Sequence, residues 1–240
     1  MKQYIPQGIK RSYRLSTRWL NDLTKGYNRQ FASTDREKVP YNGMIETRQT
    51  MRNSESAEAK IHNIKIATKE IAKCQILPDE IFSFWKWVGK PSKGKGYQEG
   101  RNLVAGELTK SIGGGLCQLS GIMYHTALKA GLEIVERHAH SQDIYQEDER
   151  YTPLGADAAV VYGYKDLRIR NSRGFPIKYT FMVNDDDLIC RLFLEENIFT
   201  HTIQFNRENK EGKEFITTIL IDPDGNKTDL GISEYLRCNQ

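Results

Sequence analysis

The stretch "SIGGGLCQLSGIMYHTALKAG" (residues 111–131) decides how the chain folds, because three consecutive glycines lead into a helical pattern that begins beside a cysteine. Apolar residues recur at every third or fourth position, as on one face of a helix: Leu116, Leu119, Met123, Ala127 and Ala130. Gly131 is a typical residue for the C-terminal end of such a helix. The sequence therefore predicts a central helix that carries Cys117 in its first turn.

The segments on either side of this helix differ in character. Residues 12–31 and 54–74 show helical spacing of apolar side chains, whereas residues 32–52 are polar and are expected to be irregular. The alternation in "IFSFWKW" (81–87) favours a strand. After the central helix, short β-like runs are separated by turn sequences such as "DPDGNK" (222–227). We predict an α+β fold with N-terminal helices, the central helix that starts at the GGGxC motif, and a mostly antiparallel C-terminal β-sheet.

Composition narrows the possible partners. The 240 residues carry a net charge of +4 at pH 7, which fits an acidic ligand without requiring one. No nucleic-acid-reading motif is present, so nucleic acid is not an expected partner. No apolar run approaches the roughly 20 residues of a membrane span, and the N-terminus lacks the apolar stretch of a signal peptide. From these features we expect no membrane span, a cytoplasmic location and reduced thiols for the four scattered cysteines.

The glycine run has a chemical use beside Cys117. Backbone N–H groups in the first turn of a helix are unpaired and the helix dipole is positive there, so both favour a thiolate. Glycines leave no side chain between a ligand and the backbone, so we expect the amides of Gly114 and Gly115 to act as oxyanion donors. Gly121 lies one turn further along and is expected to leave open space beside the sulfur.

A nucleophilic cysteine commonly needs a histidine base, and "ERHAHSQD" (136–143) supplies two. If a strand continues through this stretch, His138 and His140 point to the same side and either can face the sulfur. Asp157, in "GADAAVV", precedes an expected strand and supplies a carboxylate to orient the imidazole.

Two other interpretations stay open at this point. A His-x-His pair on a strand has suitable geometry for zinc, with Asp157 or Cys117 completing the site. Alternatively, the glycines only turn the chain into a helix, and Cys117 is a structural thiol.

Three segments together resemble the VanW family, over roughly residues 80–195. They are "IFSFWKWVGKPSKGKGYQEG", "GGGLCQLSGIMYHTALKAGLEIVERHAHS" and "GADAAVVYGYKDLRIRN", which contain the GGGxCQ, ERHxHS and DAxVxYGxxDLxxxN patterns. The resemblance implies a VanW-like domain over 54–240, with its motif core at 80–195, whereas residues 1–53 carry no motif of that family and are expected to be an N-terminal helical extension. It also implies an association with vancomycin resistance and with the cell wall. The cell wall lies outside the membrane, so this implication differs from the cytoplasmic location expected from the N-terminal sequence.

Some members of that family are linked to peptidoglycan cross-linking as L,D-transpeptidases with a cysteine nucleophile. The resemblance thus implies that Cys117 is the nucleophile and that a peptidoglycan stem peptide or muropeptide is the partner. We expect His140 to be the base, with His138 as second choice, and Asp157 to orient it. No cofactor is expected. The substrate side is expected to include Gly113, Gly114, Gly115, Gln118, Tyr97 and Arg137.

Two alternative functions accompany this one. In the first, the chain is a non-catalytic peptidoglycan- or precursor-binding module, in which the basic loop 90–101 and the aromatic side chains Tyr97, Trp85 and Trp87 hold the ligand. In the second, it is a zinc hydrolase that uses His138 and His140.

Overall fold

The structure, a computed structural model, describes residues 6–34, 39–52, 56–104, 107–143 and 150–237. The helices are α1 (Gln7–Thr24), α2 (Ala57–Ile71), α3 (Phe84–Val88) and α4 (Leu116–Lys129), with 3₁₀ turns η1 (Tyr27–Arg29) and η2 (Lys93–Lys95). The strands are β1 (Ser33–Thr34), β2 (Gly43–Thr50), β3 (Cys74–Gln75), β4 (Ile81–Ser83), β5 (Glu99–Val104), β6 (Glu107–Ile112), β7 (Glu133–Glu136), β8 (Gln142–Asp143), β9 (Arg168–Arg170), β10 (Ile177–Val183), β11 (Asp187–Leu194), β12 (Thr202–Lys210), β13 (Lys213–Ile221) and β14 (Lys227–Arg237). The predicted α+β fold, with its central helix and its antiparallel C-terminal strands, is confirmed.

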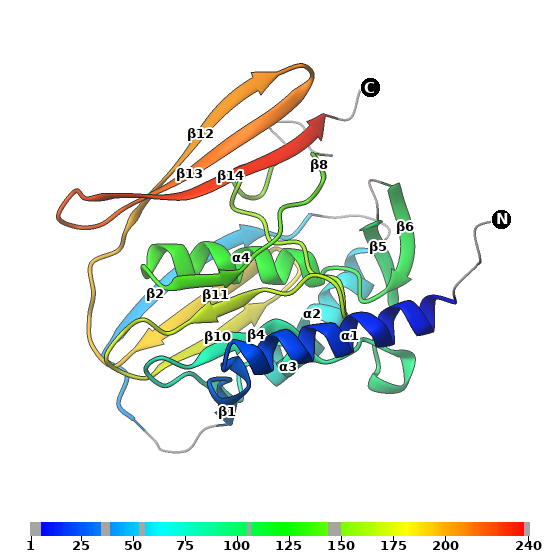
Figure 1. Cartoon of the computed structure of the whole chain (residues 1–240), viewed down its shortest axis with the longest axis horizontal. Coiled ribbons are helices and arrows are strands. Elements are labelled where there is room, and N and C mark those ends of the chain that lie inside the picture. The colour runs from blue at the N-terminus through cyan, green and yellow to red at the C-terminus, as the bar shows by residue number, and fades with distance from the viewer. Residues whose placement is uncertain (1–5, 35–38, 53–55, 105–106, 144–149, 238–240) are drawn as a thin grey trace.

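The central sheet has the order β10–β11–β2 and is antiparallel throughout. Helices α2 and α4 lie side by side on one face of this sheet (Figure 1). Their apolar stripes supply the middle of the core, where Ile64, Leu119 and Met123 are fully buried. The periodicity that predicted these two helices therefore reflects the face that each buries.

Strand β2 lies in the segment 32–52, and the expectation of irregular structure there is wrong for its eight residues. Alternate residues of β2 are buried, but two of the inward side chains, Thr47 and Gln49, are polar. The hydrophobic alternation that marks a half-buried strand is therefore hidden in the sequence. Because β2 pairs with β11 along its whole length, a boundary at 53/54 separates two neighbouring strands of one sheet.

The strand expected over 81–87 ends early. Only Ile81–Ser83 is a strand, and Phe84–Val88 turns into the short helix α3. The Ser83 hydroxyl accepts a hydrogen bond from the Lys86 backbone N–H and caps this helix. The local cap overrides the alternating pattern.

A second sheet has the order β4–β9–β7, and α1 packs beside it (Figure 1). A third sheet places β12, β13 and β14 as an antiparallel meander whose last strand also pairs with β8 in parallel. The "DPDGNK" sequence forms the β13–β14 turn as predicted, with Gly225 N–H donating to Asp222 O. Within the described ranges, no helix is both long and apolar enough to cross a bilayer.

Helix α4 begins where the glycine run ends. Gly115 occupies its N-cap with φ +96°, a left-handed conformation that favours glycine. A Cβ at this position would lie 2.6 Å from Cγ of Lys60 and 3.2 Å from Ile64, both on α2. The glycine thus permits both the backbone turn and the close approach of α2 and α4.

Candidate functional site

A cavity of about 540 Å³ opens beside the first turn of α4. Its lining comes from α1, from α3 and the loop after it, from the end of β6, from the start of α4 and from two later segments: Gln7, Arg11, Trp85, Lys90, Pro91, Ser111, Ile112, Gly113, Leu116, Cys117, His140, Ser141, Ala159, Val160, Val161, Tyr162, Tyr164 and Lys165. Cys117 is half-buried, and its Sγ lies 3.7 Å from the carbonyl oxygen of Val160. The cavity therefore reaches both the predicted nucleophile and one of the two predicted bases.

His140 is the histidine that faces this thiol. Its Nδ1 lies 2.5 Å from Oδ2 of Asp157, and the Cys117 thiol lies close enough to the ring to help raise its pKa. With Nδ1 engaged by the carboxylate, Nε2 is the ring nitrogen left for the sulfur. Cys117, His140 and Asp157 are thus brought together in the order nucleophile, imidazole, carboxylate.

Protonation of the site follows from these contacts. Burial alone would lower the pKa of His140, but its hydrogen bond with Asp157 and the nearby Cys117 thiol raise that pKa to about 10. Burial alone would raise the pKa of Asp157, yet the hydrogen bond from His140 and the charge of Arg137 hold it well below its usual value. At neutral pH the imidazolium form of His140 therefore lies between two groups that stabilise its charge.

Arg137 lies behind Asp157 and does not line the cavity, where we expected it. Its guanidinium donates to Oδ1 of Asp157 at 2.8 Å, to the Asp157 backbone oxygen at 2.7 Å and to Gly155 O at 3.0 Å. Tyr235 of β14 donates its hydroxyl to the same Oδ1 at 2.5 Å. Arg137 and Tyr235 are therefore positioning residues that hold the carboxylate toward His140.

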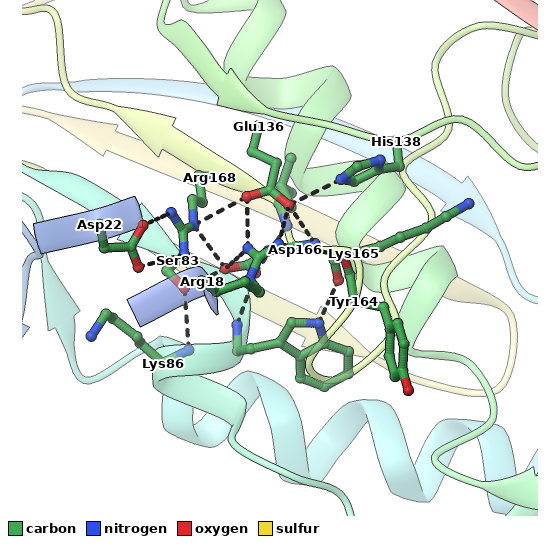
Figure 2. Close-up of polar contacts among 12 residues, drawn as sticks. Arg18, Asp22, Ser83, Lys86, Glu136, His138, Tyr164, Lys165, Asp166 and Arg168 are labelled. Atoms are coloured by element: carbon green, nitrogen blue, oxygen red, sulfur yellow. Dashed lines mark hydrogen bonds and ion pairs between the residues drawn. The ribbon is translucent and has the colours of Figure 1, made fainter. Parts of the chain in front are cut away.

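His138 is directed elsewhere. Strand β7 ends at Glu136, so the strand that would have placed both histidines on one side does not continue. Nε2 of His138 lies 2.9 Å from Oε1 of Glu136, as Figure 2 shows. The expected strand after Asp157 is also absent, because residues 156–160 have no regular secondary structure, and their backbone hydrogen bond to the histidine segment is the one from Ala159 N–H to His138 O.

Glu136 belongs to a polar cluster that joins α1 to the second sheet (Figure 2). Arg18 of α1 donates to both oxygens of Glu136, at 2.9 and 2.7 Å. Arg168 of β9 contacts Glu136, Asp166 and the α1 carboxylate of Asp22, the last at 2.5 and 3.0 Å. These interactions fix α1 in place, and α1 in turn supplies Gln7 and Arg11 to the cavity wall.

The remaining predicted residues are divided between the cavity and the core. Gly113 lines the cavity, whereas Gly114 and Gly115 do not. Gln118 and Tyr97 are buried away from the lining, at 4% and 2% exposure. Within the described chain, the Gln118 side-chain amide and the Tyr97 hydroxyl have no hydrogen-bond partner.

Gly121 does not leave open space. The backbone of residues 156–158 crosses it, with Asp157 Cα and Ala158 N each 3.6 Å from where a Cβ would lie. This close approach brings the loop that carries Asp157 against α4, and the Ser120 hydroxyl bonds Ala158 O at 2.6 Å. Gly121 therefore positions the carboxylate of the site and provides no room beside the sulfur.

Sequence reasoning missed the cavity residues of α1 and the contribution of β14. Arg11 lies 106 positions before Cys117, and Tyr235 lies 78 positions after Asp157. No short motif joins such pairs. The helical spacing of α1 was the one available signal, because Arg11, Leu15, Arg18 and Asp22 share one side of that helix.

In the zinc alternative, His138 and His140 share a ligand set, but they contact different carboxylates. Across the described ranges, no three His, Cys, Asp or Glu side chains are grouped so that they could hold a metal ion. The zinc alternative therefore gains no support from the geometry.

Comparison with known proteins places this geometry in context. The chain is 37% identical over 122 residues to the uncharacterized protein YoaR of Bacillus subtilis. This alignment covers 51% of the chain and 39% of YoaR. It is 30% identical over 158 residues to the vancomycin B-type resistance protein VanW of Enterococcus faecalis. This alignment covers 63% of the chain and 58% of that protein. The aligned regions thus span about two-fifths and three-fifths of these relatives. No solved structure gives a significant match.

A family profile described as "VanW like protein" matches residues 59–193. The matched segment contains Cys117, His140 and Asp157, but neither α1 nor β14. Because it covers more than half of the 240 residues, the chain belongs to the family of VanW-like proteins.

Proposed function

We propose that this protein is a cysteine acyltransferase that acts on peptidoglycan stem peptides, in the manner of an L,D-transpeptidase. The observation that carries the proposal is the Cys117–His140–Asp157 arrangement, with the first two residues on the wall of one cavity. Thiolate, imidazolium and carboxylate in that order are the parts needed for nucleophilic acyl transfer. The name of the enterococcal relative, a vancomycin resistance protein, supports a cell-wall substrate.

The proposed reaction has two halves. The Cys117 thiolate attacks the carbonyl carbon that precedes a terminal D-alanine, and a C–S bond forms. The C–N bond then breaks while His140 donates its proton to the departing amine of D-alanine. An amine of a second stem attacks the thioester and gives a proton to His140. The new peptide bond forms as the Cys117 thiolate leaves, so the enzyme returns to its starting state.

The tetrahedral oxyanion needs a donor near the sulfur. Gly113 N–H donates to Gln98 O and Leu116 N–H to Gly113 O, whereas Cys117 N–H has no acceptor among the described residues. It also lies in the first turn of α4, where the helix dipole favours negative charge. We therefore assign the oxyanion to the amide of Cys117 itself, alongside the earlier expectation for Gly114 and Gly115.

The test is intact-protein mass spectrometry after mixing with muropeptides that end in D-alanine. The wild type is expected to gain the mass of a stem peptide minus D-alanine, and Cys117→Ala is expected to gain nothing. A matched control is Cys190→Ala, since Cys190 is buried in the core and should not carry an adduct. Absence of an adduct on folded wild type with a free thiol would contradict the proposal. If the muropeptide still binds in that case, the non-catalytic binding module is favoured.

A further inference from the structure

The cavity beside Cys117 has a one-sided charge. Three cationic side chains line it, namely Arg11, Lys90 and Lys165, and none of the lining residues in the described part of the chain is an aspartate or glutamate. The imidazolium of His140, whose pKa is raised to about 10, is balanced by the proposed Cys117 thiolate, so the three cations set the net charge of the lining.

The three cations have no ion-pair partner in the part of the chain that the structure describes. Within the described residues, no hydrogen bond or ion pair involves the side chain of Arg11, Lys90 or Lys165. By contrast, Arg18 and Arg168, which lie close by, are both paired with carboxylates. Figure 2 shows the side chain of Lys165 extending away from that polar cluster.

The position of Arg11 at the cavity is set by the helix α1 on which it lies. The helix that carries it is fixed by Arg18 and Asp22, about two and three turns further along, through their partners Glu136 and Arg168. The side chain of Arg11 also packs against Gly163, whose added Cβ would lie 3.2 Å from Arg11 Cγ. A guanidinium in a half-buried position presents paired N–H donors that match the two oxygens of a carboxylate.

From this charge pattern we infer that the cavity recognises a free carboxylate at the C-terminus of the acyl donor, with Arg11, Lys90 and Lys165 as its binding cations. The inference rests on the proposed function and deepens it. In a donor that ends in D-alanine, the terminal carboxylate lies within one residue of the carbonyl under attack, a span of about 3.5 Å. The cavity holds Cys117 and the cations together, so such a donor can meet both.

This arrangement also states what the site rejects. A donor whose terminal carboxylate is amidated, or whose chain continues beyond the D-alanine so that its carboxylate lies further away, brings no negative charge to the cations. Since a desolvated charge without a partner is costly, the unpaired cations favour an anionic end group over a neutral one. The enzyme is therefore expected to remove or exchange only a terminal residue.

The experiment measures binding apart from chemistry. Cys117→Ala protein is titrated calorimetrically with a tetrapeptide stem that ends in D-alanine, as the free acid and as the C-terminal amide. We expect the acid to bind about tenfold or more tightly, and Arg11→Gln in the same background to abolish that preference. Arg14→Gln is the matched control, because Arg14 is an exposed arginine on the same helix and does not line the cavity.

Equal affinity for acid and amide, or an undiminished preference in both Arg11→Gln and the double variant Lys90→Gln/Lys165→Gln, would overturn the inference. These outcomes are distinct from failure of the proposed function, which is read from acyl-enzyme formation on wild type. An adduct formed equally from acid and amide donors would reject the carboxylate site and leave the acyltransferase in place. Tighter binding of the acid than of the amide, without any adduct on wild type, would support the carboxylate site and reject the acyltransferase.

Discussion

Oδ2 of Asp157 accepts two hydrogen bonds from the same residue, one from the backbone N–H of His140 at 2.8 Å and one from its ring Nδ1 at 2.5 Å. The carboxylate thereby fixes both the path of the chain and the orientation of the imidazole. Its other oxygen is held by Arg137 and Tyr235, so both carboxylate oxygens are engaged by groups of the protein.

Asp157→Asn should impair catalysis while the nucleophile remains. The amide cannot stabilise the imidazolium, so we expect the pKa of His140 to fall and the rate of acylation to drop about 10²- to 10⁴-fold. NMR titration of the His140 ring measures the change in its pKa, and a time course of acyl-enzyme formation measures the change in the acylation rate. Tyr235→Phe, which removes one donor from Oδ1 but leaves the His140 contact, is the control and should cost about tenfold or less. A His140 pKa unaltered in Asp157→Asn would refute this role.

Stability should depend on pH through His140. Its pKa in the folded protein, about 10, lies above the ordinary value of 6.5, so the interaction contributes fully below pH 6.5 and is lost as the pH rises toward 10. Urea unfolding of wild type and His140→Gln from pH 6 to pH 10 is the measurement. The stability difference between the two proteins should shrink across this range. A difference that grows with pH would show that His140 is neutral in the folded protein.

His138 and His140 should respond differently to the same substitution. His138→Gln removes a contact between a half-exposed imidazole and Glu136, so we expect a loss of less than about 1 kcal/mol and unchanged alkylation of Cys117 by iodoacetamide. His140→Gln should slow that alkylation at pH 7 by about tenfold or more, because the thiolate loses its counter-ion. Burial raises the pKa of Cys190 to about 12, so that thiol should not contribute to the signal. Equal rates in the two variants would rule out His140 as the partner of the thiol.

Arg168→Met should destabilise the protein by about 3 kcal/mol. The change leaves the buried carboxylate of Asp22 without its cation and weakens the pairing of Glu136 and Asp166. Hydrogen exchange should show α1 opening before the central sheet, since Asp22 lies on that helix. Arg191→Met is the control, because its pair with Glu46 is more exposed and should be worth less than about 1 kcal/mol. Similar losses in both variants would mean that the cluster does not hold α1.

Two glycines in and before α4 should give opposite results. Gly115→Ala is expected to cost about 2 kcal/mol, because φ is +96° and the new Cβ would meet Lys60 at 2.6 Å. Gly121→Ala meets atoms no closer than 3.6 Å and should be neutral or stabilising, since alanine favours the helix interior. Thermal unfolding measures both. A large loss in Gly121→Ala would show that the Asp157 loop lies closer to α4 than described.

The predictability of the fold depended on whether buried faces were apolar. Helices α2 and α4 bury continuous apolar stripes, so their period was visible in the sequence. Strand β2 buries Thr47 and Gln49 in the same sheet, and its alternation was therefore concealed. At α3, a single serine cap redirected a segment whose side-chain pattern favoured a strand.

The site was predictable in its members and less so in its arrangement. Local chemistry and the motif pointed to Cys117, a histidine and Asp157, and the structure brings these together. The choice between the two histidines depends on where β7 stops, which no residue in "ERHAH" announces. Arg137 was assigned to the substrate side because a charged residue in a motif suggests binding, yet its partners include Ser233 and Tyr235, almost one hundred positions away.

Helix α1 and strand β14 lie outside the segment matched by the family profile, yet one borders the cavity and the other holds Asp157. The reacting side chains therefore lie within the matched segment, whereas part of the cavity wall and one support of Asp157 lie outside it. Grafting a different leading helix onto it would alter which end groups are admitted without altering the reacting side chains. A recombinant fragment trimmed to the shared boundaries would keep Cys117 and His140 but lose both supports.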